Sequence, residues 1–224
     1  MHRFAFLAVL AALPASAAGW VQLFNGKDLS GWTVVGESVW TAMRDGTLLG
    51  QRDLLPALQR QPFMNDPSSY RAWLYRQSWL YTDREFTNFD LHVEYWLKLR
   101  GNGGISIRDT SRAAHAVTSP PDFTRTPSKI GYEIQISNQY PDQYPTGSIY
   151  TFVKAKTGLQ VDNDWNSMDI ESRPDVIRVK INSQLAAEHP GDPKRSKSGP
   201  IGLQLHDQFS VMMFRNIRIR EIVK

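Results

Sequence analysis

Titratable and hydrogen-bonding side chains recur at every second position of four short segments. These side chains are His92, Glu94 and Trp96; Ser106 and Arg108; Glu133 and Gln135; and Gln204 and His206. On a β-strand, alternate side chains point to the same face of the sheet. If the apolar residues between them face a core, all four groups are presented together on the opposite face.

A sheet face that carries carboxylates, amides, an imidazole, a guanidinium and an indole suits a ligand with many hydroxyl groups. Carboxylates and amides hydrogen-bond hydroxyls, and an indole covers the apolar face of a sugar ring. The sequence therefore indicates a carbohydrate site. The alternative is an ordinary solvated sheet face, because polar alternation by itself also produces one.

Other catalytic patterns are missing or weak. The chain has no cysteine, which excludes disulfides, thiolate metal sites and cysteine nucleophiles. The five histidines lack metal-ligand spacing, so we predict no histidine metal site. Residues 101–104 (Gly-Asn-Gly-Gly) open no helix, so we interpret them as a hairpin loop and not as a phosphate-binding loop.

One acidic cluster offers oxygen ligands. Asp162, Asn163, Asp164 and Asn166 could coordinate calcium, although their spacing is not that of an EF-hand loop. A hydrogen-bonded turn explains the same residues, because Asp and Asn side chains commonly cap turns. We predict no cofactor and leave calcium open at this cluster.

The elements that must position these residues are predicted to be strands. Residues 89–99 alternate throughout, with Leu91, Val93, Tyr95 and Leu97 on one face. The same period recurs in residues 105–108, 132–136, 176–181, 201–206 and 214–222. Many short strands with few helical stretches predict one all-β domain, an antiparallel sandwich or barrel.

One long segment interrupts the strands. Residues 53–79 mix leucines with Tyr70, Trp73 and Trp79, and three prolines break the segment. Long loops on a β scaffold are often functional. We interpret this segment as an ordered excursion with a helical turn that forms a wall of a cleft.

The N-terminal residues indicate where the protein is sent. Positive residues His2 and Arg3, the apolar run 4–13, Pro14 and Ala15-Ser16-Ala17 have the layout of a signal peptide. The run is shorter than the about 20 residues of a membrane-spanning helix. We expect residues 1–18 to be a leader and residues 19–224 to be one exported domain, periplasmic or secreted.

The charge of the chain is nearly balanced. It has 26 Lys and Arg against 22 Asp and Glu without a basic patch, so no nucleic-acid partner is predicted.

The strands also carry a family resemblance. Residues 23–32 (Leu-Phe-Asn-Gly-Lys-Asp-Leu-Ser-Gly-Trp) resemble the opening signature of the 3-keto-disaccharide hydrolase domain family. Later blocks follow in the order of that family: residues 45–48, 79–82, 101–105, 131–136, 146–150, 199–206 and 214–217. Gly103 departs from the family pattern, where serine is usual. The likeness extends from about Trp20 to Val223.

The resemblance implies an antiparallel jelly-roll β-sandwich of the concanavalin A-like lectin and glucanase type. It also implies cleavage of glycosides whose sugar is oxidised at carbon 3. The C3 ketone acidifies the hydrogen on C2, so the glycosidic oxygen on C1 can leave by elimination, after which water adds back. Such chemistry needs a base at C2, an acid at the leaving oxygen and donors that stabilise the enolate.

The chemistry that the resemblance implies gives each residue of the predicted shared face a candidate role. Glu133 is the candidate base or acid, with His206 as its proton partner. Arg108 is the third candidate catalytic residue and would stabilise the enolate, with Glu94 orienting it. The residues expected to bind substrate are Glu94, Gln135, Gln204, Trp96 and His92. Two other hypotheses stay open: a glycosidase with Glu94 and Glu133 as paired acids, and a lectin-like module that binds sugar without chemistry.

Overall fold

The structure is a computed structural model that describes residues 19–53, 61–62, 65–139 and 143–223. The expected leader, residues 1–18, lies outside the described residues, as do residues 54–60 and 63–64 of the aromatic-rich segment. The leader and the export that it implies therefore stay predictions. Among the described residues, no helix has the length and apolar character needed to cross a membrane.

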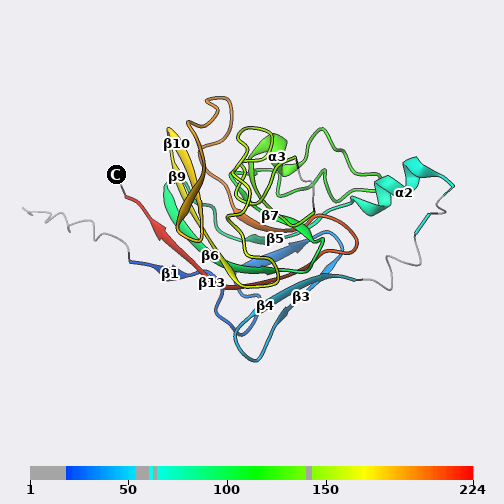
Figure 1. The fold of residues 1–224 in the computed structure, drawn as a ribbon, viewed down its shortest axis with the longest axis horizontal. Coiled ribbons are helices and arrows are strands. Elements are labelled where there is room, and N and C mark those ends of the chain that lie inside the picture. The colour runs from blue at the N-terminus through cyan, green and yellow to red at the C-terminus, as the bar shows by residue number, and fades with distance from the viewer. Residues whose placement is uncertain (1–18, 54–60, 63–64, 140–142, 224) are drawn as a thin grey trace, which may run out of the picture.

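Two antiparallel sheets form a β-sandwich, as the sequence predicted (Figure 1). The larger, sheet A, has eight strands in the order β11-β10-β9-β6-β13-β4-β3, with β1 paired to β13. Its strands are β1 (Val21–Gln22), β3 (Ser38–Ala42), β4 (Leu48–Arg52), β6 (Phe89–Leu97), β9 (Asn166–Arg173), β10 (Val176–Ile181), β11 (Gln184–His189) and β13 (Val211–Glu221).

The smaller, sheet B, has five strands in the order β2-β5-β12-β7-β8. They are β2 (Trp32–Val35), β5 (Ser78–Thr82), β12 (Ile201–Leu205), β7 (Asn102–Ile107) and β8 (Tyr132–Ser137). The described helices are α2 (Pro67–Leu74) and α3 (Pro127–Ile130). Figure 1 shows α3 and neighbouring loops stacked over β7 and β5, with α2 at the end of the molecule away from β9 and β10.

Sheet A follows the alternation that the sequence shows. On β6 every second residue is fully buried, and the residues between them are only partly buried. The buried residues, such as Leu91, Val93 and Tyr95, join the core between the sheets. Burying a large apolar side chain contributes about 1.5–3 kcal/mol, so this register is strongly favoured over a one-residue slip.

Sheet B differs because both of its faces are covered. Every residue of β5, β7, β8 and β12 is buried. On the outer face, Trp79 and Tyr81 pack against Ala113 and Ala116 of the loop after β7. The polar side chains of that face therefore lie under loops and away from bulk water, which changes their chemistry.

The glycine-rich segment is not a hairpin loop, contrary to the sequence-based interpretation. Asn102, Gly103 and Gly104 belong to β7, and the preceding turn carries the chain from β6 in sheet A to sheet B. A Cβ on Gly103 would overlap Met212 Sδ and lie 2.7 Å from Gln204 O. These glycines allow close packing inside the sandwich.

The aromatic-rich segment contains an ordered helix, as predicted. Asp66 caps α2, its Oδ1 accepting the Ser69 N–H at 3.3 Å, and Pro67 occupies the first turn. Trp73 anchors the helix, because its buried indole packs edge-on against Phe209 with ring centroids 6.1 Å apart. Trp79, predicted to end this segment, is a buried residue of β5.

Candidate active site

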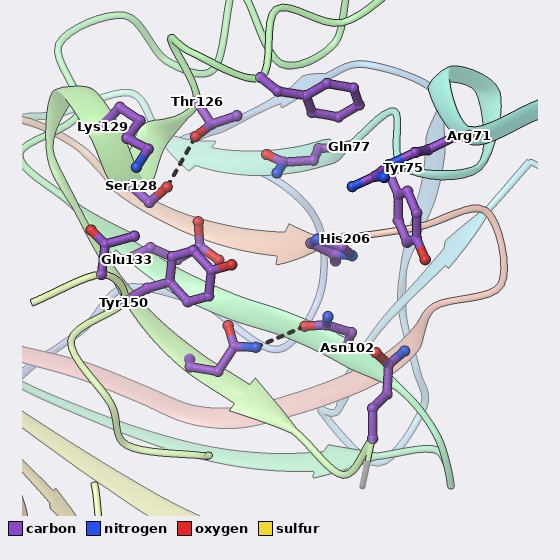
Figure 2. A pocket seen from close by; sticks show the side chains of 14 residues that line it. Arg71, Tyr75, Gln77, Asn102, Thr126, Ser128, Lys129, Glu133, Tyr150 and His206 are labelled. Atoms are coloured by element: carbon purple, nitrogen blue, oxygen red, sulfur yellow. Dashed lines mark hydrogen bonds between the residues drawn. The ribbon is translucent and has the colours of Figure 1, made fainter. Parts of the chain in front are cut away.

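A polar cavity of about 450 Å³ lies over the outer face of sheet B (Figure 2). The sheet supplies its floor, and α2, α3 and the loops around them supply its walls. The lining residues are Arg71, Tyr75, Gln77, Asn102, Phe123, Thr126, Ser128, Lys129, Glu133, Gln135, Gln139, Tyr150, Thr151 and His206. We call this cavity the Glu133 pocket.

The floor is set by the register of β7 and β8. Gly104 pairs with Gln135, and Ser106 pairs with Glu133, so the side chains of these rows point to one face. Gln135 Nε2 donates to Asn102 Oδ1 at 3.2 Å. That contact fixes both amides and leaves Asn102 Nδ2 as a donor toward the pocket.

Gly104 makes room for the acid. A Cβ there would lie 3.2 Å from Glu133 Cγ, 3.2 Å from Gln204 Oε1 and 2.9 Å from Ile134 O. Because glycine has no Cβ, the side chains from β8 and β12 approach each other across β7. The candidate residue Gln204 thus lies fully buried beside Glu133 but does not line the pocket.

Glu133 has the environment of a proton-transfer group. It is 4% exposed, and burial raises its pKa to about 7. The charge of His206 and the adjacent amide of Gln204 oppose this shift, while the negative charge of Asp109 adds to it. A carboxyl group with a pKa near neutrality can both take and return a proton at physiological pH.

His206 follows β12 and faces Glu133 across the pocket. Figure 2 shows Glu133, Ser128 and Lys129 on one side, and His206, Tyr75 and Arg71 on the other. The His206 ring lies 5.5 Å from the Tyr75 ring, and its Nδ1 lies 3.8 Å from Asp207 Oδ2. The predicted pair of carboxylate and imidazole is therefore brought together in one pocket.

The loop that covers the other half of the face is tied to the sheet by Asp109. Its Oδ2 accepts the Tyr81 hydroxyl at 2.7 Å and the Ala113 N–H at 2.8 Å, and its Oδ1 accepts the Ser111 hydroxyl at 2.6 Å. Burial and the adjacent carboxylate raise the pKa of Tyr81 well above its usual range. This buried network fixes the start of the loop that goes on to supply Phe123 and Thr126.

Arg108 does not reach the pocket, so the predicted enolate-stabilising position is wrong. Its backbone has φ 60°, which turns its side chain away from the row of Ser106. Arg108 is 1% exposed, and its guanidinium donates from Nη2 to Arg173 O at 2.7 Å and lies 5.9 Å from the Tyr132 ring centroid. Burial lowers the pKa of Arg108. Its contacts are structural.

The three residues of β6 lie on the other sheet, so the expected single shared face is also wrong. Glu94 Oε2 accepts Arg215 Nε at 2.6 Å and its Oε1 accepts Asn216 Nδ2 at 2.5 Å, so it does not orient Arg108. His92 Nδ1 lies 2.7 Å from Asp169 Oδ1. Trp96 is partly buried in the same row of β6. The strands alternate as predicted, but alternation does not reveal which sheet a strand joins.

This separation also bears on the paired-acid hypothesis. Glu94 and Glu133 lie on the outward faces of two sheets that enclose the core, and packed sheets are about 10 Å apart. The paired carboxyls of glycosidases are about 5–9.5 Å apart on either side of one bond. Glu94 and Glu133 cannot form such a pair.

The candidate calcium cluster forms a hydrogen-bonded turn. Asn166 Oδ1 accepts the Val161 N–H at 2.7 Å, and its Nδ2 donates to Asp164 O at 2.9 Å. Gln160 Nε2 contacts Asp162 Oδ1 at 3.2 Å. Among the described residues, no group of three or more His, Asp or Glu is arranged to hold a metal.

Several pocket residues come from segments where sequence periodicity has no bearing. The wall residues Arg71, Tyr75, Phe123 and Lys129 lie in or beside short helices and loops. The predicted cleft wall in residues 53–79 is the signal that pointed to Arg71 and Tyr75. For Phe123 and Lys129, only the three-dimensional path of the chain brings the side chains to the pocket.

Solved structures share this fold. A candidate glycosyl hydrolase from Parabacteroides distasonis ATCC 8503 is 21% identical, with a TM-score of 0.64 over 91% of this chain and 100% of that chain. A Bacillus subtilis protein of unknown function with a galectin-like fold is 12% identical, with a TM-score of 0.59 over 92% and 96%. Bacillus licheniformis beta-glucanase is 11% identical, with a TM-score of 0.54 over 93% and 100%.

Sequence comparison adds the family. Among curated proteins, none matches the chain significantly. Residues 19–220 match the model of a family described as the 3-keto-alpha-glucoside-1,2-lyase-like domain. The match includes the strands of the sandwich up to Arg220 of β13 and every described residue that lines the Glu133 pocket.

Proposed function

The chain belongs to the family of 3-keto-alpha-glucoside-1,2-lyase-like domains, and from this premise we propose that the Glu133 pocket cleaves 3-keto-glycosides. The observation that carries the proposal is the pairing of one buried acid with one imidazole. Glu133 is the only carboxylate among the described residues that line the pocket, and its pKa is about 7. His206 faces it across the floor.

A lone acid suits elimination better than displacement. Most glycosidases that act without a keto group use two carboxyls. In the proposed reaction, Glu133 takes the proton from C2, and the electron pair moves onto the C3 carbonyl oxygen. Re-forming the C3 carbonyl creates a C1–C2 double bond and expels the glycosidic oxygen, which takes a proton from His206. The products are an unsaturated keto-sugar and the free alcohol.

Addition of water completes a net hydrolysis. The water oxygen attacks C1 and gives a proton to His206, while Glu133 returns its proton to C2. Both groups then stand in their starting states. Lys129 and Asn102 line the pocket, and their ammonium and amide Nδ2 are the donors that can face the enolate oxygen, in the role predicted for Arg108.

Substrate oxidation state tests this function. The purified protein, incubated with 3-keto-glycosides and with their unoxidised parents, should release the alcohol from the keto set only. In heavy water, recovered keto-sugar should carry deuterium at C2. Equal cleavage of the unoxidised set would overturn the proposal. Binding without turnover of either set would instead favour the lectin-like alternative.

The pH profile supplies a second test. As the base, Glu133 must be ionised, so kcat/KM for a 3-keto-glycoside should fall about tenfold for each pH unit below about 7. With an ordinary carboxyl pKa the fall would begin near pH 4.5. A stopped assay from about pH 5 to 8 measures the midpoint. A profile that stays level down to pH 5 contradicts a base with the raised pKa.

A further inference from the structure

A second hollow of about 300 Å³ adjoins the Glu133 pocket, and we call it the rim hollow. Its lining residues are Leu74, Tyr75, Lys98, Leu99, Arg100, Gly101, Gln139, Asp207 and Phe209. Tyr75 and Gln139 line both spaces. A ligand in the Glu133 pocket that extends past Tyr75 therefore enters the rim hollow.

The rim hollow presents apolar surface to solvent. Leu99 is 58% exposed and Phe209 is 53% exposed. Phe209 is nonetheless held in place. Its ring packs edge-on against Trp73, and its backbone N–H donates to Asp207 Oδ1 at 2.9 Å. A fixed, exposed aromatic ring is suited to stack on a flat apolar group.

The charge of the rim hollow is positive. In the described part of the chain, neither Lys98 nor Arg100 has an ion-pair partner. Asp207, the one acid among the described residues that line the hollow, is 7% exposed, and its Oδ1 accepts the backbone N–H of Phe209. Two cations beside an aromatic shelf complement a ring that carries a negative charge.

The leaving group must depart on this side. In the proposed function, on which this inference rests, His206 protonates the glycosidic oxygen. The His206 ring lies beside the ring of Tyr75, which lines both the Glu133 pocket and the rim hollow. We infer that the rim hollow binds the aglycone and that this aglycone is an aromatic ring with an anionic substituent.

The test compares two substrates that differ only in this charge. They are the 3-keto-α-glucosides of 4-hydroxyphenylacetic acid and of 4-hydroxyphenylacetamide, whose phenols leave with nearly equal ease. KM should be about fivefold lower for the acid, since each exposed ion contact contributes up to about 1 kcal/mol. The double variant Lys98→Gln/Arg100→Gln should remove that difference. Lys27→Gln, at an exposed residue outside both hollows, should keep it.

A binding measurement separates this inference from the proposed function. The free phenols are titrated by ligand-observed NMR, which detects millimolar binding and needs no turnover. The acid should bind more tightly than the amide, and Phe209→Ala should weaken both. Equal binding of acid and amide overturns the inference, as does a preference that survives the double variant. If no keto-glycoside is cleaved, the proposed function fails while the titration still decides the aglycone site.

Discussion

Replacing Glu133 by Gln should lower kcat/KM for 3-keto-glycosides by about 10³-fold, within the range by which general acid–base groups act. The amide keeps the shape of the side chain and its place between Gly104 and Gln204, but it cannot accept the C2 proton. Exchange of the C2 hydrogen with heavy water should be lost in parallel. Progress curves and NMR of the recovered substrate measure both.

The same variant has a built-in folding control. Burial raises the pKa of Glu133 from 4.5 to about 7. The free energy of unfolding therefore decreases as the pH rises from about 4.5 to 7, and this penalty is absent at lower pH. Gln removes this cost, so at about pH 8 the variant should be more stable by roughly 1–3 kcal/mol. Denaturant titration measures this difference in the free energy of unfolding.

Glu94→Gln, on the other sheet, is the matched control for the activity loss and should keep activity. A fully active Glu133→Gln protein refutes the base.

Replacing His206 by Gln should have an effect that depends on the leaving group. A sugar or methanol leaves poorly as an anion and needs a proton, so kcat for those 3-keto-glycosides should fall about 10²-fold. A 4-nitrophenolate leaves without one, so the same substitution should cost that substrate less than about fivefold. The ratio of the two losses reports proton donation by His206 rather than a general disturbance of the pocket.

Two outcomes separate proton donation from binding. If His206 only positions the substrate, the loss will be the same for every leaving group and will show in KM. The control is His92→Gln, a histidine whose Nδ1 contacts Asp169 on sheet A, and its kinetics should match the unmodified protein. Thermal unfolding of both variants verifies that the fold is intact.

The strands were predictable because their apolar and polar residues alternate with a local period. Residues 89–99 alternate in sequence, and β6 alternates between buried and partly buried positions in the structure. On β8 every residue is buried, but polar and apolar residue types still alternate, and this alternation places Glu133 and Gln135 together on the pocket floor. His206, at the end of β12, reaches the same pocket. The part of the site built on neighbouring strands of one sheet could thus be predicted from periodicity.

The same rule misplaced residues wherever sheet membership or a backbone turn mattered. Glu94 alternates as Glu133 does, but β6 pairs with β9 and β13 in sheet A. Arg108 has the spacing of a pocket residue, but its positive φ sends its guanidinium to Arg173 O. Neither fact leaves a trace in the spacing of polar residues.

The raised pKa of Glu133 was equally out of reach. A polar residue on a strand is usually solvated, and only the loops above sheet B make this one 4% exposed. Those loops are held by long-range contacts, such as Tyr81 to Asp109 and Trp73 to Phe209. The chemistry of the carboxyl thus depends on segments far from it in the chain.

The sequence by itself determined the antiparallel sandwich and the family. It also determined that Glu133, Gln135 and His206 share one face of a sheet. Both follow because alternation and short signature blocks are local properties of a chain. Tertiary structure decided which polar rows meet in one pocket, which acid loses its water and where the rim hollow opens beside Tyr75. The physical reason is that pairing between strands and packing of loops are non-local, whereas the period of a strand is two residues wherever it lies.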